Sequence, residues 1–510
     1  MMRNTLTLIF IFSLSSLFAQ EPAKNMLEPC GTPAGISPWL RFYSDHKAEM
    51  EYRSNDTLWV GLQAHLLARD NGTGRFPFDR FMDALCRLNT DFAESNIQFY
   101  LKDDINLIDN SAWYAHTTIP AGIDMMLTNN VDDAFNSYFV GNPAGNCGYN
   151  LPYGGVAIGH SCASASDHTW AHEAGHALSL PHPFIGWEGK QYNYAIPTPT
   201  SVTYDYTYFH DTIDTQIPAP LDTALVEYVD GSNCAIASDL ICDTKPDYIS
   251  SRWTCNGQGM SPAIQKDPAG VDFQSDGSLF MSYADDACQT RFSPEEIQVM
   301  RANLATEKAN WLGSAPQLGE ITQLVNQISP IQDQVVPVAG TQLVWSSAPN
   351  ATHYVVEASR FSSYALREVE MITSDTFVTT PALLANRTYY WRVKAFNAAH
   401  FCADLSESAT FVTAPTSAAF EPDSEGWRCY PTVLSPGHVL NLEIPESWLG
   451  KTSKVACYDV AGNLKWDSKL LISGYKMMLQ VPLENWQTGL YYLVLSNEMG
   501  IKRQALMIAK

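Results

Sequence analysis

The chain has 510 residues, of which 45% are hydrophobic and 17% charged, so it is globular and too long for a single core. Asp and Glu outnumber Lys and Arg by 54 to 31, giving a net charge of -23, which argues against nucleic acid or an anionic membrane surface as a partner. The 11 cysteines indicate disulfides if the chain is exported, and their odd number leaves at least one thiol without an intramolecular partner.

Residues 1–19 are predicted to be a secretory signal peptide. Arg3 supplies the positive start, an apolar stretch runs from Leu6 to Phe18, and Ala19 ends a loose cleavage site. The apolar stretch is short for a membrane span, and no later run is longer. We therefore expect an exported protein without a stable membrane span.

Residues 20–54 are interpreted as a pro-segment, because they have weak periodicity and few strand formers. The sequence Cys-Gly-Thr begins at Cys30. A thiolate binds zinc well, so Cys30 is a candidate latency ligand that would block a zinc site further along the chain. The alternative is that Cys30 is an ordinary disulfide partner. Cleavage near Arg41 or Arg53 would release the segment.

The next region predicts the start of a mixed sheet with a backing helix. Apolar residues alternate over 57–68 and again over 97–101, which is typical of strands, and an amphipathic helix is predicted between them over 77–94. Cys86 lies beside the apolar stripe of this helix and is predicted to be a buried free thiol. Residues 154–160 are predicted to form an edge strand that could pair with an extended peptide.

The sequence His-Glu-Ala-Gly-His begins at His172. On a helix, His172 and His176 lie on one face, and Glu173 lies one position round, within reach of a metal-bound water. His182 follows where Ser179 and a proline should end the helix. Three neutral nitrogen ligands with one open position are the arrangement of a catalytic zinc. His160 and His168 are interpreted as polar neighbours, because three ligands are already provided.

A long and mostly irregular segment follows, up to about residue 275, and segments of that length need tethering. Four cysteines allow three pairings here: Cys234, Cys242, Cys255 and Cys288. Asp239, Asp243 and Thr244 place two carboxylates and a hydroxyl close together, which suits calcium. A solvated turn is the alternative. Beyond this segment, a capping box over Ser-Pro-Glu-Glu at 293–296 predicts another helix.

With these motifs in place, residues 55–312 resemble a metzincin metallopeptidase, and within that clan the pappalysin family. The residues that carry the resemblance are His172, Glu173, His176 and His182, then Met281-Ser282-Tyr283, Asp285-Asp286-Ala287-Cys288 and Arg291-Phe292. Asp239 and Asp243-Thr244 also resemble the calcium-site stretch of that family. The resemblance implies a zinc cofactor and an α+β catalytic domain with a mixed twisted sheet, backing and active-site helices, and an irregular C-terminal subdomain.

The resemblance also assigns roles to residues around the zinc. It implies that Met281 lies under the metal as a hydrophobic floor and that Tyr283 reaches the metal or the oxyanion; ordinary core is the alternative for both. Asp285 or Asp286 could make the primed-side pocket acidic and favour a basic residue in the substrate after the cleaved bond. One departure is Ser179, where the family has glycine. A left-handed conformation at this serine would cost on the order of 1 kcal/mol.

Two all-β sandwich domains are predicted after the catalytic region. Alternation over residues 316–415 resembles a fibronectin type III sandwich, which would serve as a spacer or a weak binding surface. Residues 419–510 resemble the C-terminal sorting domain of the type IX secretion system. That resemblance implies export through the periplasm of a Gram-negative bacterium to the cell surface or beyond, with the secretion machinery as a partner. The alternative is a second binding sandwich.

The sequence therefore predicts a secreted zinc endopeptidase. The domains are a signal peptide at 1–19, a pro-segment at 20–54, a zinc peptidase domain at 55–315 and the two β domains. The three histidines bind zinc, and Glu173 acts as general base on a metal-activated water, with proteins or peptides as substrates. The alternative is a catalytically silent, metzincin-like adhesin that binds extracellular protein through its β domains.

Overall fold

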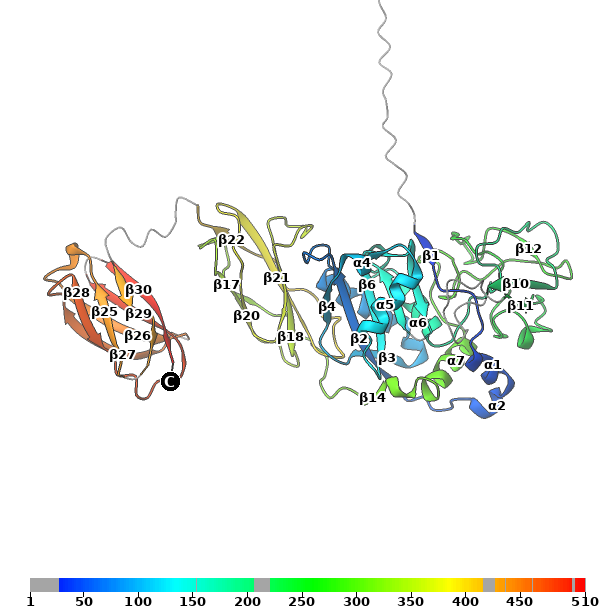
Figure 1. Cartoon of the computed structure of the whole chain (residues 1–510), viewed down its shortest axis with the longest axis horizontal. Coiled ribbons are helices and arrows are strands. Elements are labelled where there is room, and N and C mark those ends of the chain that lie inside the picture. Colours follow the sequence, from blue (N-terminus) through cyan, green and yellow to red (C-terminus); the bar gives the residue numbers. More distant parts are fainter. Residues whose placement is uncertain are drawn as a thin grey trace, which may run out of the picture. The chain divides into compact units, whose positions relative to one another are not determined.

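The structure is a computed structural model that describes residues 27–152, 154–205, 221–415, 427–435, 437–460, 462–497 and 500–509 (Figure 1). The predicted signal peptide and the first residues of the pro-segment lie outside the described residues. In the described ranges, no helix combines the length and the apolar character that crossing a membrane would require.

A mixed sheet of eight strands forms the centre of the N-terminal α+β region (Figure 1). Its main path runs β1-β8-β9-β6-β2-β14, and β3 and β4 also pair with β2. Most neighbours are parallel, whereas β8 is antiparallel to β9 and β14 to β2. The predicted mixed sheet is therefore confirmed. The strands are β1 (Glu28–Cys30), β2 (Leu58–Ala68), β3 (Ile97–Leu101), β4 (Asn106–Asp109), β6 (Phe135–Val140), β8 (Asn146–Leu151), β9 (Gly155–Gly159) and β14 (Leu312–Gly313).

The helix predicted after β2 is confirmed as α3 (Phe78–Asp91). Its apolar stripe, which includes Phe81, Leu85 and Leu88, is buried in the same core as β2 and β3. The chain then passes through a single 3-10 turn, which ends at Asn96 in the left-handed conformation with φ 52°. The helix is thus shorter than predicted, because this turn leads directly into β3.

The predicted edge strand at residues 154–160 is an interior strand instead. It forms β9, which pairs with β6 on one side and with β8 on the other. Beyond β9 lies β8, and β1, from the predicted pro-segment, pairs with β8 in parallel as the outermost strand at this side of the sheet. Alternation in a sequence identifies a strand but not its neighbours, and β8 is rich in Asn, Gly and Tyr and showed no strand pattern.

Two helices frame the region around the histidine motif. Helix α6 (Thr169–Ala177) carries the motif, and every one of its residues is buried. Helix α7 (Pro294–Ala305) begins with the predicted capping box, in which the Ser293 and Glu296 side chains each bond the other's backbone N–H, at 3.0 and 2.6 Å. The remaining α-helices are α1 (Pro38–Asp45), α2 (Lys47–Met50), α4 (Ser111–Tyr114) and α5 (Ile119–Asn129).

Disulfides tether the irregular segment as predicted. The pairs are Cys234–Cys242 and Cys255–Cys288, and a further pair, Cys147–Cys162, joins β8 to the turn after β9. The same segment contains two antiparallel strand pairs, formed by β10 (Ser201–Asp205) with β11 (Leu221–Leu225) and by β12 (Gln265–Lys266) with β13 (Asp272–Phe273).

The prediction that Cys86 is a free thiol is wrong. Cys86 forms a disulfide with Cys402, which lies 316 residues further along the chain, with a Cα–Cα distance of 5.3 Å. Cys86 lies at the border of the apolar stripe of α3. Its side chain therefore faces the segment that carries Cys402 rather than the core of the sheet. The free cysteines are Cys30, Cys429 and Cys457.

The C-terminal part is all-β, as predicted. The first sandwich has sheets β15-β17-β20 and β16-β22-β21-β18-β19, and the second has sheets β23-β25-β28 and β24-β30-β29-β26-β27. The strands of the first are β15 (Gln327–Ser329), β16 (Gln334–Val336), β17 (Gln342–Trp345), β18 (His353–Ser359), β19 (Val369–Thr373), β20 (Phe377–Thr379), β21 (Thr388–Phe396) and β22 (Ala409–Thr413). The strands of the second are β23 (Arg428–Tyr430), β24 (Val433–Leu434), β25 (Val439–Glu443), β26 (Thr452–Asp459), β27 (Leu464–Leu471), β28 (Lys476–Gln480), β29 (Gly489–Asn497) and β30 (Gly500–Ile508).

The chain divides into two compact units. The first contains the α+β region together with residues 340–381 and 388–411, and the second contains residues 335–339, 382–387 and 412–510. Strands β18, β19 and β21 of the first sandwich therefore belong to the same unit as the α+β region.

The packing of α6 on Met281 generates a stability prediction. A Cβ atom at Gly175, in the middle of α6, would lie 2.5 Å from Sδ of the fully buried Met281. We expect Gly175→Ala to destabilise the fold by about 1–3 kcal/mol through overpacking, in spite of the higher helix propensity of alanine. Gly257→Ala, at a glycine whose Cβ would meet nothing within 4 Å, is the matched control. Equal unfolding midpoints for the two variants would contradict this packing.

Candidate metal centre

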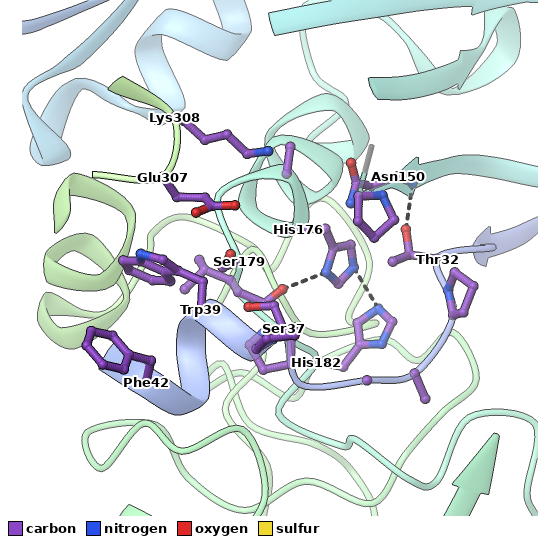
Figure 2. Close-up of a pocket in the computed structure, with 18 of the residues that line it drawn as sticks. Thr32, Ser37, Trp39, Phe42, Asn150, His176, Ser179, His182, Glu307 and Lys308 are labelled. Carbon is purple, nitrogen blue, oxygen red and sulfur yellow. Dashed lines mark hydrogen bonds between the residues drawn. The ribbon is translucent and has the colours of Figure 1, made fainter. Parts of the chain in front are cut away.

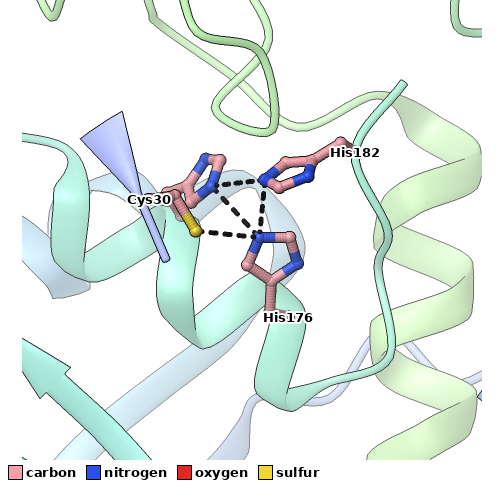
Figure 3. A group of neighbouring side chains, drawn as sticks. Cys30, His176 and His182 are labelled. Atoms are coloured by element: carbon pink, nitrogen blue, oxygen red, sulfur yellow. Dashed lines mark hydrogen bonds between the residues drawn. The ribbon is translucent and has the colours of Figure 1, made fainter. Parts of the chain in front are cut away.

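Three histidine side chains converge in a buried site (Figure 3). His172 and His176 lie one turn apart on α6, and their Nε2 atoms are 3.1 Å apart. His182 follows the end of the helix, and its Nε2 lies 3.2 Å from that of His172 and 3.1 Å from that of His176. The three nitrogens that the sequence predicted as ligands therefore face one common point.

The opposite ring nitrogen of each histidine meets an oxygen acceptor. The Nδ1 atoms of His172, His176 and His182 lie 2.7, 2.7 and 3.0 Å from the carbonyl oxygens of Phe280 and Leu180 and a carboxylate oxygen of Glu188, respectively. An oxygen at that distance holds the proton on Nδ1, so Nε2 carries a free lone pair. The surroundings thus orient each imidazole so that Nε2 is the nitrogen available to a metal.

The geometry fits zinc. Zn–N bonds of 2.0–2.1 Å at tetrahedral angles separate two ligand nitrogens by about 3.3 Å, close to the 3.1–3.2 Å found between the Nε2 atoms. Burial also favours the neutral form, because it lowers the pKa of His172 to about 3 and that of His176 well below its usual value, with a smaller contribution from His182. Three inward lone pairs so close together repel one another unless a cation lies between them.

The turn that delivers His182 keeps the conformation expected of a glycine. Ser179 has φ 74°, in the left-handed region. Its hydroxyl accepts a hydrogen bond of 3.1 Å from Nδ2 of Asn303, a buried residue of α7. The serine therefore carries the backbone strain that the sequence predicted, and its side chain gains a partner that glycine would lack.

Glu173 points into the same site from α6. Its side chain is fully buried, which raises the pKa of its carboxyl to about 8. Oε2 accepts a 2.8 Å hydrogen bond from the hydroxyl of Thr32, whereas Oε1 has no partner among the described residues. Gly148 on β8 makes room for this carboxylate, since a Cβ there would lie 2.9 Å from it.

Met281 and Tyr283 both lie near the helix that carries the histidines, and the roles that the resemblance implied for them stay predictions. Met281 is fully buried against Gly175 of α6. The ring of Tyr283 lies 5.0 Å from that of His182 and 5.9 Å from that of His172, centroid to centroid. Its hydroxyl donates a 3.2 Å hydrogen bond to the carbonyl oxygen of Cys30.

Cys30, from the predicted pro-segment, lies beside the histidines. Sγ of Cys30 lies 3.7 Å from Nε2 of His176, and the sulfur points toward the histidines (Figure 3). Among the described residues Cys30 joins the three histidines in one group whose ligand atoms all lie within 4.8 Å of one another. Burial, and then the nearby Glu173, hold the pKa of the thiol well above its usual value.

Thr32 was not among the predicted site residues, although it belongs to the Cys-Gly-Thr motif. Its hydroxyl donates to Glu173 and accepts a 2.7 Å bond from the backbone N–H of Asn150 on β8. Beside it, a cavity of about 360 Å³ lies between residues 32–42 and the end of α6, with Trp39 on one side and His176 on the other (Figure 2). The predicted pro-segment thus leaves part of this space open.

The residues predicted to bind calcium do not share one centre. Asp239 is buried, which raises its pKa to about 7, and it accepts from the Thr244 hydroxyl at 3.1 Å. Asp243 instead accepts from Ser293 and from the N–H of Glu295 at the start of α7, at 2.6 and 2.8 Å. In the described ranges neither aspartate belongs to a group of three close metal-binding side chains. The calcium site stays a prediction.

Asp285 and Asp286 lie just after Tyr283 and already have partners. Asp285 accepts from the Thr254 hydroxyl. Asp286 accepts a 2.9 Å bond from the backbone N–H of His168 and lies 3.6 Å from the guanidinium of Arg252. Arg252 offsets the negative charge on which the acidic pocket depends, so a preference for basic substrates also stays a prediction.

His160 and His168 are not in the four-residue group that contains the other three histidines. His160 stacks on Phe76, and His168, at the start of α6, pairs with Asp91 of α3 at 2.9 Å. Glu188 is a further residue that the sequence reasoning missed. It lies in an irregular segment, where no periodicity marks one acidic residue among several.

Comparison with known proteins assigns no family. No protein-family model and no curated protein matches the chain. Among solved structures, a mutant of promirolysin from Tannerella forsythia is 14% identical over 55% of this chain and 95% of that one, with a TM-score of 0.35. Fibronectin(III)-like modules of Clostridium thermocellum CbhA are 10% identical over 36% of this chain and 93% of theirs, with a TM-score of 0.16. Such low TM-scores do not establish a shared fold.

The Ser179 turn generates a prediction. Ser179→Ala keeps the left-handed strain and leaves the Asn303 amide without its partner, so we expect a loss of about 1–3 kcal/mol. Ser179→Gly loses the same bond but relieves about 1 kcal/mol of strain, and should unfold at a higher temperature than the alanine variant. Thermal unfolding of the two proteins measures the difference. A glycine variant no more stable than the alanine variant would exclude strain at this position.

Proposed function

We propose that the protein is a zinc-dependent endopeptidase of the metzincin type, related to the pappalysins, with its catalytic domain at residues 55–315. One observation carries the proposal. Three buried imidazoles, each fixed in the neutral tautomer by an oxygen on Nδ1, turn their Nε2 atoms toward one point beside Glu173. A structural zinc site has four permanent protein ligands and no general base. Here the fourth group, Cys30, belongs to the segment that we propose is released, which leaves three histidines and a neighbouring carboxylate.

His172, His176 and His182 would hold the metal. Zn²⁺ bound there would polarise the carbonyl of the scissile peptide bond and lower the pKa of a bound water to about 7. Glu173 takes the proton from the attacking water and later delivers it to the leaving amine. The hydroxyl of Tyr283 donates to the oxyanion of the tetrahedral intermediate. Burial of Glu173 supports a role as a proton carrier, because it brings the pKa of the carboxyl to about 8, near the working range.

The described form fits a latent precursor held by two contacts. Cys30 is the latency ligand at the metal side, with its sulfur 3.7 Å from Nε2 of His176. Thr32 engages the general base, because its hydroxyl donates to Glu173 at 2.8 Å. Strand β1 meanwhile pairs with β8, the sheet edge along which an extended peptide could pair. Removing the pro-segment would free the metal, Glu173 and the edge of β8.

The setting of the enzyme is extracellular in this proposal. Four disulfides support maturation in an oxidising compartment. The signal peptide, the fibronectin type III-like domain at 316–415 and the type IX sorting domain at 419–510 are carried forward as proposals on their sequence patterns. The rival function is a silent adhesin. The burial of Glu173 beside the three histidines supports the peptidase, because a binding protein has no use for a general base.

The first test concerns Glu173. In the processed protein, Glu173→Gln should keep the zinc and lower the hydrolysis of casein by at least a hundredfold, because the general base is lost. Glu94→Gln, at an exposed glutamate, is the matched control and should keep full activity. Unchanged casein cleavage by Glu173→Gln would exclude the peptidase mechanism, and no cleavage by either the wild type or the control would favour the adhesin.

The second test concerns latency. In the uncleaved chain, Cys30→Ala and Thr32→Val should each raise peptidase activity several-fold, and the double variant should raise it most, because the two contacts act on different groups. Thr57→Val, at an exposed threonine, is the control for the threonine change. A double variant that stays as latent as the wild type would show that other parts of the pro-segment hold the enzyme inactive.

A further inference from the structure

One face of α3 is turned toward the first sandwich. Asp79, Asp83 and Cys86 follow one another at spacings of four and three residues, so they lie on the same side of the helix. Each of the three contacts a residue on or near strands β18, β19 and β21. All of these residues belong to one compact unit of the chain.

The most buried contact is an ionic cluster around Asp79. Arg367 bonds both carboxylate oxygens of Asp79, at 2.9 and 2.8 Å, and Arg392 reaches the same carboxylate at 3.0 Å. Both guanidinium groups also bond Glu357, whose side chain is fully buried, at 2.7 and 2.8 Å. A buried charge is stable only when it is paired. Asp79 therefore depends on arginines that the sandwich contributes.

The sandwich also caps α3. The residue before the helix, Pro77, makes no side-chain capping bond. Instead, Glu370 of β19 accepts a 2.8 Å hydrogen bond from the N–H of Phe78, the first residue of the helix. A carboxylate at this end satisfies a free N–H and complements the helix dipole. The capping group comes from a strand 292 residues further along the chain.

Three more contacts extend the same surface. Asp83 pairs with the buried Lys394 at 2.6 Å, and Cys86 forms the disulfide with Cys402. The N–H of Leu101, at the end of β3, donates to the carbonyl oxygen of Ala398 at 2.8 Å. The apolar core is shared as well, because three buried sandwich residues belong to the same cluster as the α+β core: Val355, Phe396 and Phe401.

The opposite side of α3 contacts the helix that carries the histidines. The ring of Phe81 lies 6.0 Å from that of Trp170 on α6, centroid to centroid. At the end of α3, Asp91 bonds the ring of His168 at 2.9 Å. His168 is the N-cap residue of α6, and its own side chain makes no capping bond to that helix. The start of α6 is therefore held from outside, and α3 supplies part of that support.

We infer that strands β18, β19 and β21 of the first sandwich are a permanent part of the catalytic domain. Residues on and beside these strands cap α3 and neutralise its buried charge, and through α3 they position the start of α6. The sandwich is then neither a spacer nor a detachable module. Asp79, Asp83 and Glu370 are positioning residues in this account. The inference rests on the proposed function only where it treats α6 as the helix that binds zinc.

The test uses the full chain and an exchange of charges. Lys394→Asp places a carboxylate against Asp83, and Asp83→Lys places an ammonium against Lys394. We expect each single variant to speed amide hydrogen exchange in α3 and α6 at least tenfold. The double variant D83K/K394D, which restores the pair in reverse, should return both helices close to the wild-type rates. Reversal of the exposed pair Lys454–Asp467 in the second sandwich is the control and should leave α6 unchanged.

Two further variants keep the test decisive if a charge reversal fails to fold. Cys86→Ser with Cys402→Ser removes the disulfide, and Glu370→Gln removes the charge from the cap while keeping an oxygen acceptor. Both should increase exchange in α3 first and in α6 next. Exchange in α6 that stays at the wild-type rate in all the folded variants would overturn the inference. Because the measurement does not use catalysis, it is independent of whether the protein cleaves peptides.

Discussion

The structure depends on one constraint, which is the approach of three imidazole nitrogens to 3.1–3.2 Å in a buried site. Their lone pairs face one another, and burial opposes the protonation that would relieve the repulsion. The protein holds them with oxygens of Phe280, Leu180 and Glu188, all of which lie outside its helices and strands. Such an arrangement is stable with a cation at the centre, and it explains why the turn at Ser179 is kept in spite of its strain.

The elements around this site each preserve its geometry. Met281 supports α6 from below at Gly175, and β8 passes so close to Glu173 that only glycine fits at position 148. Strand β1 lies equally close, because its pairing with β8 brings the thiol of Cys30 and the hydroxyl of Thr32 to the two groups that the proposed chemistry needs. In the function that we propose, latency and catalysis therefore use the same site.

Much of the site could be predicted from the sequence. His172, Glu173 and His176 lie in a short motif with helical spacing, α7 begins with a capping box, and alternation indicated the mixed sheet. Met281 and Tyr283 were named only through the resemblance to a known family. The failures concern contacts between distant residues. Cys86 lies 316 residues from its disulfide partner, and β9, which was predicted as an edge strand, is an interior strand. Local periodicity carries no information about either, nor about Glu370 as the cap of α3.

The zinc content of the purified protein tests the central claim most directly. The account predicts one zinc per chain in the wild type, less than a tenth of that in His182→Ala, and full occupancy in His438→Ala, a change at an exposed histidine of the second sandwich. The variants should otherwise keep the same circular dichroism spectrum. A wild-type protein that binds no zinc, or a His182→Ala variant that binds as much as the wild type, would contradict the account.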